Sequence, residues 1–84
     1  MDVTIDCRLL TSREALHRVF AEALSLPEYY GKNLDALHDC LTSLSGTIHL
    51  KDWDQNGLEK AAIPVRKVLQ AAMLHNPNLT IFFE

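Results

Sequence analysis

The sequence predicts an α/β fold in which a three-stranded parallel sheet packs with three to four helices. Three short segments show the alternating or apolar patterns of strands, and helical patterns separate each of them from the next. A parallel connection needs a crossover of about a dozen residues, usually with a helix, and this spacing provides it. A chain of 84 residues has room for one domain only, which we expect to span residues 1–84.

The first strand and the first helix are predicted within the first 26 residues. Residues 3–7 form a short, β-branched, alternating run that is typical of a strand. Thr11 and Glu14 fit a capping box at the start of a helix, and Ser12 is the alternative cap. The apolar stripe of this helix stops before Pro27, so we expect the helix to end there.

A loop and a second helix follow. In the loop 27–32, Gly31 permits a backbone turn that a side chain would disfavour. The second helix is predicted over residues 34–44, with Asn33 as a possible N-cap and Gly46 as the stop signal. It is the least apolar helix, so we expect it at the edge of the packed layer with its acidic side outward.

The second half of the chain repeats the pattern of strand, helix and strand. Residues 47–50 alternate as a strand does, whereas residues 54–60 are polar and fit either a loop or a short helix. Pro64 suits the first turn of a helix whose apolar periodicity is the strongest in the chain, and which ends at residues 75–77. The apolar run 79–83 predicts a buried third strand.

Composition excludes several function classes. Apolar residues make up 48% and charged residues 23%, as in average globular proteins, and the net charge is −3. The basic side chains form no stripe, so no nucleic acid is expected as a partner. No signal peptide or membrane span is evident, so we expect a cytoplasmic protein without membrane attachment.

Cysteine and histidine usage predicts no cofactor and no metal. Cys7 and Cys40 are too few for a disulfide framework, and we expect both to be reduced. The histidines are dispersed, without a CxxC or HxxxH pair, so structural zinc is not expected. His17 and His75 are expected at the surface, whereas Trp53 is expected in the core.

The segment 26–42, LPEYYGKNLDALHDCLT, is the candidate binding region. It puts two tyrosines, a glycine and two carboxylates at one loop-to-helix junction, and one tyrosine ring is expected to point inward and the other outward. Asp35 and Asp39 are neighbours on the polar side of the predicted helix, and like charges at this spacing cost about 0.2 to 0.5 kcal/mol. A positive partner would explain the pair. The alternative is an acidic solvated surface, since Asp35 alone is favoured in the first helical turn.

An enzyme is not expected. Asp35, His38 and Asp39 supply the residue types for acid and base chemistry, but an exposed helix surface gives neither the burial that tunes pKa values nor a cleft for a substrate. The sequence contains no glycine-rich phosphate loop, nucleophile elbow or HExxH motif.

Three stretches of this segment resemble the signature of the barstar family, intracellular inhibitors of the ribonuclease barnase. They are Leu26-Pro27-Glu28-Tyr29-Tyr30-Gly31, Asn33-Leu34-Asp35-Ala36-Leu37 and Asp39-Cys40-Leu41-Thr42. The resemblance implies a barstar-like fold, a small parallel sheet flanked by helices. It also implies a bacterial immunity protein, monomeric when free, whose partner is a barnase-like ribonuclease or another basic nuclease or toxin. A non-inhibitory module that binds another basic partner through the same acidic face is the alternative.

The resemblance also implies roles for individual residues. The partner-binding residues would be Tyr29, Gly31, Asn33, Leu34, Asp35, His38, Asp39 and Thr42. Asp39 would be the anchor, taking the place of a substrate phosphate among the cations of the ribonuclease, with Asp35 in support and Tyr29 packed beside it. This chain departs from barstar in having His38 and Leu44 where barstar has tryptophans. A further acidic contact from a later helix is expected near Ile63, where this chain has no acid.

Overall fold

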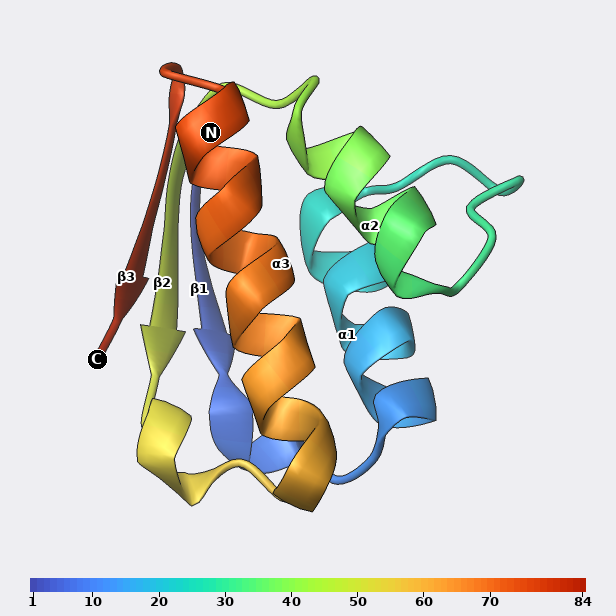
Figure 1. Ribbon diagram of the computed structural model, residues 1–84, viewed down its shortest axis with the longest axis vertical. Coiled ribbons are helices and arrows are strands. Elements are labelled where there is room, and N and C mark those ends of the chain that lie inside the picture. Colours follow the sequence, from blue (N-terminus) through green and yellow to red (C-terminus); the bar gives the residue numbers. More distant parts are fainter.

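The structure, a computed structural model that describes residues 1–84, contains a parallel sheet with its three strands in chain order. Strand β1 spans Asp2–Asp6, β2 spans Gly46–Lys51 and β3 spans Leu79–Phe83. When neighbouring parallel strands follow one another in chain order, right-handed crossovers place all the connecting helices on the same face of the sheet. Figure 1 shows all three α-helices on one side of the sheet. The predicted α/β architecture is confirmed.

The helices begin and end close to the predicted positions. Helix α1 spans Arg13–Leu24, α2 spans Leu34–Leu41 and α3 spans Ala62–His75. Short 3-10 turns, Trp53–Gln55 and Glu59–Ala61, occupy the polar segment before α3. For residues 54–60 the sequence allowed either a loop or a short helix. The structure has short helical turns joined by loop residues.

Local hydrogen bonds explain two of the boundaries. Ser12, and not Thr11, caps α1, since its hydroxyl accepts a hydrogen bond from the Ala15 amide at 3.0 Å. Helix α2 ends three residues before the predicted position, at Leu41. The amides of the next residues bond only three positions back, Ser43 to Cys40 at 3.2 Å and Leu44 to Leu41 at 3.2 Å, so the last turn tightens and stops.

The core lies between the sheet and the helices. The register puts Val3, Ile48 and Ile81 in one row that points toward the helices. Trp53 packs edge-on against Phe83 at a ring distance of 5.1 Å and is buried, as predicted. The outer face of the sheet is uncovered. Residues 79–83 form the predicted strand, but only Leu79 and Ile81 are buried as expected, whereas Phe82 points to the uncovered face and is 48% exposed.

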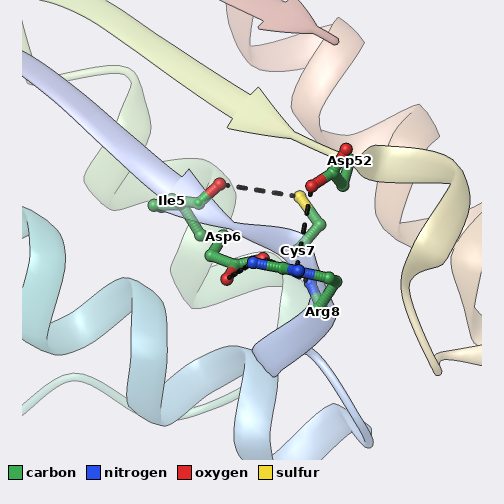
Figure 2. Close-up of polar contacts among 5 residues, drawn as sticks. All are labelled: Ile5, Asp6, Cys7, Arg8 and Asp52. Carbon is green, nitrogen blue, oxygen red and sulfur yellow. Dashed lines mark hydrogen bonds and ion pairs between the residues drawn. The ribbon is translucent and has the colours of Figure 1, made fainter.

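Ion pairs around Arg8 join the carboxyl ends of β1 and β2 (Figure 2). The Arg8 guanidinium lies 2.9 Å from the carboxylate of Asp6 and 3.8 Å from that of Asp52, which follows β2. The hydrogen bonds from Arg8 hold the pKa of Asp6 below its ordinary value. Exposed pairs of this kind contribute little free energy. Cys7, between Asp6 and Arg8 in the sequence, is buried, and its thiol lies 3.9 Å from the Ile5 carbonyl oxygen.

The two free cysteines are expected to differ in reactivity. Cys7 is fully buried, and burial raises the pKa of its thiol to about 12, whereas Cys40 is only partly buried. Because the thiolate is the reactive form, a disulfide reagent should modify Cys40 in the folded protein and Cys7 only after unfolding. Thiol titration of the protein and of its Cys40→Ser variant, with and without urea, measures this. Equal reaction rates of both thiols in the folded protein would contradict the expectation.

Candidate functional site

The candidate site is built on a loop that is fastened to α1 by Tyr30. The Tyr30 ring is 7% exposed, and its hydroxyl lies 2.5 Å from Nδ1 of His17. A turn brings the Tyr30 amide to the Pro27 carbonyl at 2.9 Å. The prediction of a surface position for His17 is wrong. The residue is 5% exposed because it lies on the inward side of α1, where the Tyr30 hydroxyl satisfies its ring.

Tyr29 points the other way and is 88% exposed. The expectation that one tyrosine ring packs inward and the other outward is confirmed. A side chain so exposed contributes little to the core, and an aromatic ring brings a large apolar surface to any contact that buries it. Tyr29 is therefore the apolar group of the loop that is free to contact a partner.

Asn33 caps α2 and braces the loop at the same time. Its side-chain oxygen accepts a hydrogen bond from the Ala36 amide at 2.8 Å, and its side-chain amide donates to the Gly31 carbonyl at 3.2 Å. The left-handed residue of the loop is Lys32, with φ of 53°, and not Gly31. Gly31 matters instead because a Cβ there would lie 3.2 Å from Nδ2 of Asn33, so a side chain would push against the cap.

The outward side of α2 presents two carboxylates. Asp35 and Asp39 are both exposed, and the Asp39 side chain is 87% exposed. Thr42 is less available, since its hydroxyl donates to the Asp39 carbonyl oxygen at 2.7 Å and closes the helix end. As Figure 1 shows, α2 lies beyond α3 from the sheet, and it packs mainly on α3. This agrees with the expected position at the edge with the acidic side outward.

His38 is not a freely exposed residue of this face. Its Nε2 lies 3.1 Å from Nδ1 of His75, the last residue of α3, and the rings meet edge to face at 5.3 Å. His75 is exposed, as expected. Ile63, near which the later-helix contact with a partner is expected, is exposed. It lies near the start of α3, about 18 Å along the helix axis from His75, which contacts His38 of α2.

Asn76 supports the site and has no equivalent in the sequence-based prediction. It is buried, and its side-chain amide donates to the carbonyl oxygens of Leu41 at 2.9 Å and Leu44 at 2.7 Å. Its side-chain oxygen accepts from the Asn78 amide at 3.1 Å. Asn76 thus ties the end of α2 to the start of β3. From the sequence, Asn76 is predicted only to end the helix, because an asparagine followed by a proline is sufficient to end α3.

The candidate residues do not converge on one cavity. Tyr29 and Asp39 line a mostly apolar hollow of about 330 Å³. Asn33 and Leu34 line a second hollow of about 670 Å³ on the α1 side of the loop. The other four line neither hollow: Gly31, Asp35, His38 and Thr42. The set forms an extended surface, which suits contact with a macromolecule better than enclosure of a small substrate.

Protonation of His17 is expected to destabilise the fold. Burial, with a contribution from Arg13, lowers the pKa of His17 below its ordinary value near 6.5, so the unfolded chain binds the proton more readily. The free energy of unfolding should fall as the pH drops below about 6.5, by at most about 1.4 kcal/mol per pH unit, and level off below the folded-state pKa. His49 acts in the opposite sense, because its hydrogen bond to Glu84 raises its pKa.

Urea unfolding at neutral and mildly acidic pH separates the two histidines. A His17→Gln variant should lose less stability on acidification than the unchanged protein, whereas His49→Gln should lose more. An identical pH dependence for the protein and its His17→Gln variant would show that His17 does not titrate differently on folding.

Other site types find no support in the geometry. No group of three or more histidine, cysteine, aspartate or glutamate side chains is arranged to hold a metal ion. None of the helices has the length and apolar character required to cross a membrane. What the surface does offer is a rigidly supported loop and helix with exposed acidic and aromatic groups.

A one-sided parallel sheet, with an outer helix that presents two exposed carboxylates beside an exposed tyrosine, defines a small α/β protein with an acidic surface. Comparison with known proteins identifies the family. The model of the family described as barstar (barnase inhibitor) matches residues 1–75, so the chain belongs to the barstar family. A Bacillus subtilis (strain 168) protein named "Putative ribonuclease inhibitor YrdF" is 40% identical over 75 residues, which cover 83% of this chain and 82% of that protein. The resemblance inferred from residues 26–42 is confirmed.

Proposed function

We propose that this protein inhibits a barnase-like ribonuclease, or a related basic nuclease toxin, by placing its acidic loop and helix in the active site. The principal observation is the Asp39 carboxylate, which is 87% exposed at the edge of the hollow that it shares with Tyr29. A ribonuclease must bind phosphates with cations, and a carboxylate on a rigid support can occupy the position of a phosphate. The family description and the name of the relative both refer to ribonuclease inhibition.

Pre-organisation supports this role. The loop is fixed by Tyr30 on His17 and by Asn33 across Gly31, and the end of α2 is fixed by Asn76. An interface that is already ordered loses less conformational entropy on binding, so more of the contact energy appears as affinity. The protein would act in the cytoplasm of a bacterial cell as a monomer that meets the nuclease there, in the manner of an immunity protein.

The non-inhibitory alternative depends on one observation. His38 stands where barstar has a tryptophan, and its ring is engaged by His75, so the face lacks that aromatic contact. Aromatic residues supply much of the energy of typical interfaces. A protein that had retained the carboxylates but lost this contact could bind another basic partner without blocking its active site.

Titration of barnase with the protein distinguishes the two functions. Under the inhibitor proposal, ribonuclease activity falls to zero at one equivalent, and association slows as salt is raised because the charges are exposed. Full ribonuclease activity in the presence of excess protein would contradict the proposal, and binding measured under those same conditions would support the non-inhibitory module.

A further inference from the structure

The larger hollow beside the acidic face has the opposite charge. It lies between the first turns of α1 and the loop before α2, and its volume is about 670 Å³. Its lining consists of Arg13, Glu14, His17, Arg18, Lys32, Asn33 and Leu34. The protein has a net charge of −3. The hollow thus contains three cationic side chains and one carboxylate. Its local charge is positive, opposite in sign to the net charge of the protein.

None of the three cations is neutralised by the protein itself. Arg13, Arg18 and Lys32 are exposed, and no carboxylate lies within 4 Å of their charged groups. Arg8 and Lys51, by contrast, are paired with the carboxylates of Asp6 and Glu84. Three like charges around one hollow repel each other. Their arrangement therefore adds nothing to the stability of the free protein.

The lining argues against a small organic ligand. Pockets for such ligands are lined mostly by apolar and aromatic groups, whereas Leu34 is the only apolar residue here. The hollow is instead continuous with the proposed interface, since Asn33 and Leu34 belong to both. Any ribonuclease that covers α2 and its loop also covers the edge of this hollow.

We infer that the hollow receives an acidic side chain of the ribonuclease, a carboxylate that flanks the cationic centre bound by Asp39. This inference depends on the proposed function and adds a property of the partner to it. The inhibitor would then recognise two features of the ribonuclease surface. Cations would face Asp35 and Asp39, and an anion would face the three basic residues of the hollow. A nuclease with a cation at the second position would be repelled, so the hollow would select among basic nucleases.

The sign of the charge effect provides the test. Removing a positive charge makes the inhibitor more acidic, and overall attraction to a basic enzyme should then rise. A direct contact with a carboxylate reverses that expectation. We therefore expect Arg13→Gln, Arg18→Gln and Lys32→Gln each to weaken binding to barnase by roughly two- to fivefold, the range of exposed ion pairs. Combined, the three substitutions should weaken binding further.

Lys67→Gln is the matched control. Lys67 lies on α3, is exposed and unpaired, and lines neither hollow, so its removal changes the net charge by the same amount. The affinity of the Lys67→Gln variant for barnase should be unchanged or slightly higher. Circular dichroism and urea unfolding confirm that each variant is folded, and isothermal titration with barnase measures the affinities.

Each outcome has a definite meaning. If the three hollow variants behave as Lys67→Gln does while Asp39→Ala still loses binding, the carboxylate contact is wrong and the inhibitor function stands. If barnase is neither bound nor inhibited by the unchanged protein, the proposed function fails and this inference fails with it. If inorganic phosphate shifts the amide resonances of Arg13, Arg18 and Lys32 in the free protein, and the variants retain full affinity for barnase, the hollow is a small-anion site and the inference is overturned.

Discussion

Replacing Asp39 with alanine is expected to weaken inhibition of barnase by a factor of roughly 30 or more, which corresponds to about 2 kcal/mol at the lower bound for an interface hot spot. An aspartate of barstar itself is the extreme case of such a hot spot, so the value of about 2 kcal/mol is a lower bound. The physical cause is general. Truncation leaves the desolvated cations of the enzyme without a counter-charge, and that penalty is much larger than the loss of a pair at the rim.

Two further variants separate the charge of Asp39 from its shape and from the net charge of the protein. Asp39→Asn keeps the size of the side chain and removes the charge, so it should lose nearly as much affinity as Asp39→Ala. Asp54→Ala removes one exposed carboxylate from the turn before α3, outside the proposed face, and should change the affinity by less than about threefold. Equal effects of Asp39→Ala and Asp54→Ala would show that only net charge matters and would remove Asp39 as the anchor.

Most of the fold could be predicted because its signals are local. Strand alternation, the apolar stripe of α3, and capping by Asn33 each occur within a few residues of sequence. The run 79–83 could not show that only one face of the sheet is covered. An apolar run has the same composition whether helices cover one face of its strand or both. The exposure of Phe82 follows from the chain order of the strands, which places the helices on one face.

The candidate site was predicted less completely, because its supports come from distant parts of the chain. Tyr30 and His17 are 13 residues apart, and His38 and His75 are 37 apart. No motif in the sequence links the two members of either pair. A lone histidine in an amphipathic helix is compatible with either surface or core, and only the position of the partner decides between them. The exposure of Asp35 and Asp39 was accessible to prediction because it follows from helical periodicity, whereas the sequence did not show which of the two tyrosines points outward.

Asn76 is the distant support with the largest expected effect on stability. Replacing it with alanine leaves the carbonyl oxygen of Leu44 without a donor and that of Leu41 with only the Leu44 amide, and it removes the acceptor for the Asn78 amide. An unsatisfied buried polar group costs about 1 to 3 kcal/mol, so the free energy of unfolding should fall by roughly 2 to 4 kcal/mol. That is a large share of the roughly 4 to 13 kcal/mol typical for a chain of this length.

The same substitution should also weaken inhibition, because Asn76 holds the end of α2 against the rest of the molecule. Urea unfolding and barnase titration measure the two effects on one variant. Asn76→Asp keeps an acceptor for Asn78 but directs a carboxylate at two carbonyl oxygens, so it should recover little of the stability. Asn78→Ala is the control, since Asn78 is exposed and contributes only backbone groups, and it should change stability by less than about 0.5 kcal/mol. If Asn76→Ala were as mild as Asn78→Ala, the end of α2 would have to be held by its apolar contacts alone, and its position would not depend on this buried amide.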